Sequence, residues 1–190
     1  MEKTENSIVD GVIWKQLLLF FFPILIGTFF QQLYNTVDTV VVGQYVGKEA
    51  LAAVGTTGTV LNLLVGFFVG VSSGATVIVS QFFGAEDREN VSKAVHTSMA
   101  LAIVGGVVIM VVGFVSARPV LVAMSVPEEI LEDALLYMNV YYAGIIANMI
   151  YNIGTGILRA IGDSRMPLYI LIVCCLANVV LDLLFVVVFH

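Results

Sequence analysis

The sequence has 190 residues, of which 59% are hydrophobic and only 12% are charged. A soluble domain typically carries about 25% charged residues and roughly 45–50% apolar ones. With 8 Lys and Arg against 14 Asp and Glu, and a formal net charge of -6, the composition excludes a soluble enzyme, a disordered segment and a nucleic-acid binder. A mean hydropathy of +1.02 is typical of a polytopic helical membrane protein.

Long apolar runs predict the membrane-spanning helices. A helix needs about 20 predominantly apolar residues to cross the hydrocarbon core. The charge-poor runs predict five helices, at about residues 14–42, 51–83, 94–116, 132–158 and 166–189. We expect the second to start in a loop-like way near Gly55 and Gly58. The sequence therefore predicts an all-α membrane bundle with no soluble domain.

The basic residues predict the orientation of these spans. Cytoplasmic loops carry an excess of Lys and Arg. If the five spans alternate, one side holds Lys3, Lys15, Arg88, Lys93, Arg159 and Arg165, and the other side holds only Lys48 and Arg118. We therefore expect a multi-pass protein of the cytoplasmic (inner) membrane with its N-terminus in the cytoplasm.

Small and helix-breaking residues point to packing and bending. Gly66, Gly70 and Gly74 recur at four-residue spacing, which favours close packing against another helix of the same chain. Pro23 removes a backbone hydrogen bond inside the first span and predicts a kink there. Such a kink is either static or a hinge.

Two carboxylates lie where a membrane span should be apolar, at Asp38 and Asp182. A charge near the bilayer centre costs several kcal/mol, so such residues face a cavity, an ion or a partner. The alternative for Asp38 is that it sits near the end of its helix and is hydrated. Asn178 precedes Asp182 by four residues and so shares its helix face.

Other polar residues extend these stripes. Gln31 and Tyr34 share a face with Asp38, Asn35 lies nearby, and Asn148 and Asn152 form a stripe on the fourth span. Three stripes can line one cavity. No Lys or Arg lies deep in a span, so a proton, Na⁺ or a positively charged substrate must balance the acids.

The chemistry of the coupling ion stays open at this point. Carboxylate and amide oxygens suit a hard cation, which makes Asp38, Asn178 and Asp182 a candidate Na⁺ site. A buried carboxyl group can instead carry a proton. No zinc motif, nucleophile elbow or Walker sequence is present, and we expect no cofactor beyond H⁺ or Na⁺.

Four motifs in this order are similar to those of the multidrug and toxic compound extrusion (MATE) transporters. The first helix offers Pro23, Gln31, the segment Tyr34–Asp38 and Gly43. The later motifs are Ser80–Ala85, then Leu158–Asp163 followed by Pro167, and finally Asn178 with Asp182. The resemblance extends over nearly the whole chain.

The resemblance implies a transporter of twelve helices in two six-helix lobes, which exports organic cations in exchange for H⁺ or Na⁺. It places Asp38, Asn178 and Asp182 in a cation or proton site, Gln31 and Tyr34 at the same cavity, and Pro23 at a bend. This chain would then be part of the N-lobe, with five of twelve helices. Its partners would be small organic cations, membrane lipid and the remainder of the transporter, without nucleic acid.

Three other functions compete with this one. A flippase for lipid-linked precursors, from the same superfamily, would need a basic cavity for its anionic cargo, whereas this one is acidic and rich in amides. An intramembrane aspartyl protease is disfavoured because Asp163 lies in a loop between Arg159 and Arg165. A non-transporting structural subunit would tolerate neutralisation of Asp38 and Asp182.

Overall fold

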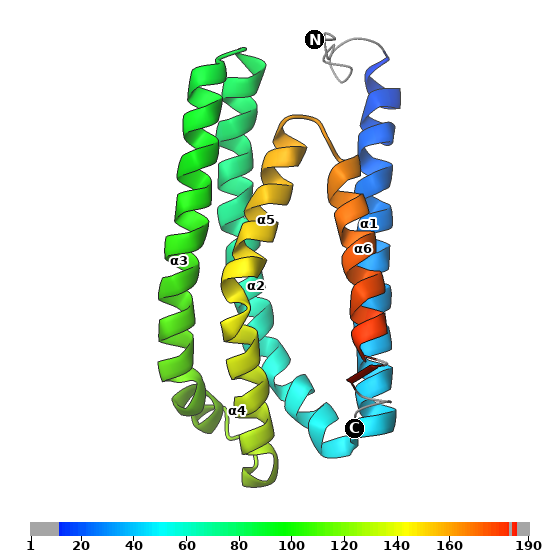
Figure 1. The fold of residues 1–190 in the computed structure, drawn as a ribbon, viewed down its shortest axis with the longest axis vertical. Coiled ribbons are helices and arrows are strands. Elements are labelled where there is room, and N and C mark those ends of the chain that lie inside the picture. The colour runs from blue at the N-terminus through cyan, green and yellow to red at the C-terminus, as the bar shows by residue number, and fades with distance from the viewer. Residues whose placement is uncertain (1–11, 183, 186–190) are drawn as a thin grey trace. The chain divides into compact units, whose positions relative to one another are not determined.

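The computed structural model describes residues 12–182 and 184–185. Within them every regular element is a helix, as predicted (Figure 1). The elements are α1 (Ile13–Val41), the π-helix η1 (Val42–Val46), α2 (Lys48–Gly84), α3 (Arg88–Ala123), α4 (Glu128–Ala143), α5 (Ile145–Ala160) and α6 (Arg165–Asp182).

The helix lengths make this a multi-pass membrane protein. Four helical segments are long and apolar enough to cross a membrane: α1 continued through η1, α2, α3 and α6. The consecutive helices α4 and α5 pass the same test together, but they are bent by 49° at Gly144. If this bent pair is one span, the described residues hold up to five spans.

Several boundaries differ from those expected. The third helix runs over 88–123 rather than 94–116, because Asp87 caps its polar first turn and Pro119 lies inside the helix without ending it. The second helix is continuous from Lys48, so the loop-like start at Gly55 and Gly58 was wrong.

The region expected as one helix over 132–158 begins earlier and is interrupted. Glu128 and Glu129 occupy the first turn of α4, where negative charge is favourable at a helix N-terminus. The break at Gly144 then divides the region into α4 and α5. The expected end of the last helix at residue 189 lies outside the described residues.

Contacts divide the chain into two compact units, Met1–Val41 with Leu158–His190, and Val42–Ile157. The second unit has an apolar core in which Phe68, Leu121 and Met138 are almost fully buried. Its helices approach closely at two glycines of α3: a Cβ at Gly106 would lie 3.1 Å from the Ile146 Cα, and one at Gly113 would overlap the Tyr142 ring.

The predicted glycine contact on α2 is absent from the described part of the chain. A Cβ at Gly66, Gly70 or Gly74 would meet nothing within 4 Å. The buried face of α2 instead carries Phe68 and Ser72, and then Ala75 and Val79. The glycines occupy other faces of the helix, so spacing alone did not identify the packed side.

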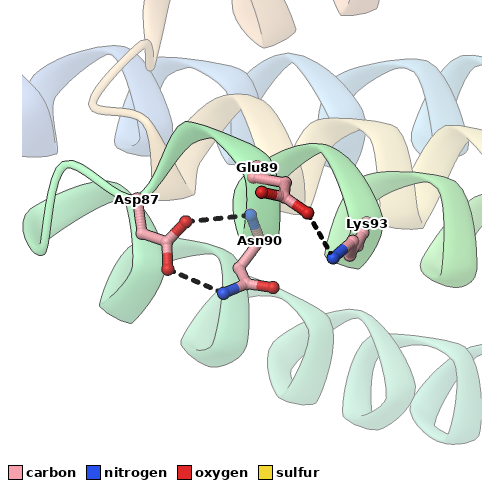
Figure 2. A network of polar contacts seen from close by, with 4 residues as sticks. All are labelled: Asp87, Glu89, Asn90 and Lys93. Atoms are coloured by element: carbon pink, nitrogen blue, oxygen red, sulfur yellow. Dashed lines mark hydrogen bonds and ion pairs between the residues drawn. The ribbon is translucent and has the colours of Figure 1, made fainter.

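A polar network caps α3 at the turn after α2 (Figure 2). The Asp87 carboxylate accepts hydrogen bonds from the Asn90 backbone N–H at 3.1 Å and from its side-chain amide at 2.6 Å. Both bonds favour the ionised form and hold the pKa of Asp87 below its usual value. Lys93 pairs with Glu89 at 2.6 Å beside it, but both side chains are exposed.

The Asp87 cap predicts a pH-dependent stability. Because the folded pKa is lowered, the contribution is present above the unfolded value of about 3.9 and is lost as the pH falls through the folded value. Asp87→Ala should therefore lower the thermal midpoint of the purified protein near neutral pH, and the gap to wild type should close on acidification. Lys93→Ala breaks the exposed pair but leaves Glu89 in the first turn of α3; it is the control and should change little, since exposed ion pairs contribute little. A gap that widens in acid would contradict this role.

Candidate functional site

The helices α1 and α6 pack side by side and run in the same direction (Figure 1). A Cβ at Gly27 would lie 3.3 Å from the Leu171 Cδ2. Further along, the Cys175 thiol donates to the Phe30 carbonyl at 3.9 Å, across 145 residues of sequence. This parallel register brings the ends of the two helices together.

Asp38 and Asp182 meet at that end of the pair. The Asp38 carboxyl group lies within hydrogen-bonding reach of the Asp182 carboxyl group. Both residues are half-buried, and Asp182 is the last residue of α6. A hydrogen bond between two carboxyl groups needs a proton on one of them.

Two oxygen atoms of α6 have no hydrogen-bond partner within the described residues. They are Oδ1 of Asn178 and Oδ2 of Asp182, both buried and one helical turn apart. Unsatisfied polar atoms are costly in an apolar surrounding, and a bound cation would satisfy both. Beyond Lys15 and Arg165, neither α1 nor α6 carries a basic residue that could neutralise the acids.

The other residues expected on α1 differ in their exposure. Tyr34 is half-buried on the same helix face as Asp38, whereas Gln31 and Asn35 are exposed. The backbone carbonyl of Asn35 accepts from Thr39 Oγ1 at 2.8 Å. Pro23 lies within α1, which continues as one helix on both sides of it.

The amides expected on the fourth span belong to the second unit, on α5. Asn152 Nδ2 donates to Asn148 Oδ1 at 2.6 Å, so these two side chains face each other. The Asn152 carbonyl also accepts from Ser72 Oγ of α2 at 2.6 Å. The structure thus brings Asn148 and Asn152 together, and separately brings Asp38, Asn178 and Asp182 together.

Three residues with buried polar atoms were not identified from the sequence. Ser72 is buried against α5, and Asn139 of α4 has a buried Oδ1 without a partner among the described residues. The Cys175 thiol of α6 contacts the α1 backbone at the Phe30 carbonyl. Ser72 shares its helix face with the apolar residues Phe68 and Val79. This helical spacing was the signal in the sequence that Ser72 is buried.

Comparison with known proteins shows a family match over most of the chain. The MatE family model matches residues 23–184. Probable multidrug resistance protein YoeA of Bacillus subtilis is 30% identical over 169 residues, which are 89% of this chain and 36% of YoeA.

Solved transporter structures match this chain over nearly its whole length. A MOP superfamily transporter from Pyrococcus furiosus, described as having a binding pocket of reverse polarity, matches with a TM-score of 0.90 and 28% identity. MATE structures in a straight and in a bent conformation each match with a TM-score of 0.88 and 28% identity. All three comparisons cover 97% of this chain and 41% of the matched chain, so the chain spans less than half the length of these relatives.

Proposed function

This chain belongs to the MatE family of multidrug efflux transporters, and from that premise we propose that it forms part of an antiporter that exports organic cations in exchange for H⁺ or Na⁺. The observation that carries the proposal is that the Asp38 and Asp182 carboxyl groups meet. Two buried oxygen atoms at this place, Asn178 Oδ1 and Asp182 Oδ2, lack hydrogen-bond partners among the described residues. The site would be the coupling site, with Asn178 as its third member.

The chemistry of the pair supports exchange between cations. Carboxyl and amide oxygens are ligands for a hard cation such as Na⁺, and a proton shared between the carboxyl groups neutralises the same charge. Either ion would remove the attraction of the site for an organic cation. Coupling ion and substrate would then occupy the transporter in alternation, as exchange requires.

The other residues predicted for the site suit an organic cation. Tyr34 offers an aromatic face, and a cation is attracted to such a face. Gln31, Asn35, Asn148 and Asn152 offer amides that can orient a substrate. We propose these five residues for the substrate cavity, with the cytoplasmic membrane as the location and the N-terminus on the cytoplasmic side.

Pro23 is proposed as the hinge of α1. Solved MATE relatives exist in a straight and in a bent conformation. A proline within a helix removes one backbone hydrogen bond and weakens resistance to bending at that point. Because Asp38 lies on the same helix, bending at Pro23 would move it relative to its partners on α6.

The proposal requires the helices that the matched relatives have beyond the part this chain covers. The chain spans 36% of YoeA and 41% of the matched transporter structures. Alternating access generally requires one half of a transporter to rock against the other. We therefore expect transport only from the complete protein that contains these residues.

The proposal is tested by driving transport with one ion gradient at a time. The complete transporter, reconstituted in liposomes, should move a cationic dye against its gradient when an opposing Na⁺ or proton gradient is imposed. An anionic lipid-linked cargo should not move. A rate of dye movement that does not change with either ion gradient would contradict cation coupling. Movement of the anionic cargo without movement of the dye would favour the flippase alternative.

A further inference from the structure

The contact between α1 and α6 repeats with the same spacing on both helices. Gly27 lies eleven residues before Asp38, and Leu171 lies eleven residues before Asp182. Eleven residues complete about three helical turns, so each contact pair lies on one face of its helix, roughly 16 Å apart along the axis. The Gly27–Leu171 contact and the acid pair are therefore two points on one interface.

The two helices approach closely at Gly27. It is buried, and an added Cβ would lie 3.3 Å from Leu171 Cδ2 and 3.7 Å from Leu168 Cδ1. The first distance is tighter than ordinary van der Waals contact, so a methyl group fits only if the leucine side chain moves. A larger side chain would push the helices apart.

Cys175 makes a second contact between α6 and α1, at a position along the helices between Gly27 and the acid pair. Its buried thiol points at α1 and donates to the Phe30 carbonyl. It lies seven residues before Asp182, which is about two turns along the same face of α6. A small side chain at this position again keeps the two helices close.

We propose that Gly27 and Cys175 are positioning residues, which hold α1 and α6 at the separation at which Asp38 and Asp182 meet over one coupling cation. This inference rests on the proposed function. A hydrogen bond between carboxyl groups needs an oxygen–oxygen distance of about 2.5–3.0 Å, so a small outward shift of α1 breaks it. A larger side chain at position 27 should therefore weaken binding of the coupling ion, although that side chain does not contact the ion.

The test uses dye efflux by the complete transporter, measured over a range of coupling-ion concentrations. Gly27→Leu should raise the concentration for half-maximal efflux by roughly 5–30-fold, while the maximal rate at saturating ion is largely retained. Leu171→Ala removes the opposing side chain, and the double variant should return to within about threefold of wild type. Thr28→Leu places the same leucine side chain at the adjacent, exposed position and should match wild type.

Two results would overturn the inference. One is an unchanged half-maximal concentration in Gly27→Leu, and the other is a shift that Leu171→Ala does not reverse. If Gly27→Leu fails to reach the membrane, Gly27→Ala replaces it and should shift the concentration in the same direction by a smaller factor, while no shift there would count against the inference.

Asp182→Asn, measured in parallel, separates this inference from the proposed function. Normal efflux by that variant contradicts the coupling site itself. Loss of efflux in Asp182→Asn, together with wild-type behaviour of Gly27→Leu, contradicts only the positioning role.

Discussion

Asp182→Asn and Asp38→Asn are each expected to reduce efflux of a cationic dye at least tenfold in the complete transporter, a loss of about 1.4 kcal/mol or more in transition-state stabilisation. Asparagine keeps the volume of the side chain but removes its charge and its ability to release a proton. The two carboxyl groups meet where α1 packs against α6, so the loss of either carboxyl group disables the same site. Efflux from cells loaded with the dye measures the effect.

The controls separate loss of coupling from loss of protein. The amount of each variant in the membrane should equal that of wild type, because removing a buried charge from a membrane span does not add an insertion cost. Asp163→Asn is the matched carboxylate control, since Asp163 caps α6 outside the spans by accepting from the Arg165 and Met166 backbone N–H groups, and asparagine caps equally well. Wild-type efflux in both Asp38→Asn and Asp182→Asn would contradict the assignment of the coupling site.

The acid pair could be predicted because its signal is local. A carboxylate in an apolar run is conspicuous, and the four-residue spacing of Asn178 and Asp182 places both on one face. That Asp38 and Asp182 come from helices that pack in parallel, with Leu171 against Gly27, depends on the tertiary register. No local pattern encodes that register.

Other features escaped prediction because neighbouring helices decide them. The break at Gly144 falls in an apolar stretch that reads as one continuous span. The close glycine contacts include Gly27, Gly106, Gly113 and Gly156, whereas a Cβ at Gly66, Gly70 or Gly74 on α2 would meet nothing within 4 Å in the described chain. Which glycine is packed depends on the face that a helix presents, and spacing on one helix does not determine that face.

Gly156→Ala is expected to destabilise the protein, whereas Gly154→Ala on the same helix is not. A Cβ at Gly156 would overlap Ser72 Oγ and lie 2.6 Å from Thr76 Oγ1 and 3.2 Å from the Ser72 carbonyl oxygen. Overpacking of this kind costs about 1–3 kcal/mol. A Cβ at Gly154 would meet nothing within 4 Å, and the higher helix propensity of alanine should stabilise α5 there by up to about 1 kcal/mol.

The sign of the difference between these two variants tests the α2–α5 contact. The thermal midpoint of the complete transporter in detergent, followed as the fraction that survives heating as a monodisperse species, should fall for Gly156→Ala and stay level or rise for Gly154→Ala. Adding Ser72→Ala to Gly156→Ala removes one of the overlapping oxygens, but it also removes the hydrogen bond to the Asn152 carbonyl, so recovery should be only partial. Equal shifts in the two glycine variants would mean that helix propensity, and not the packing of α5 on α2, decides stability at this position.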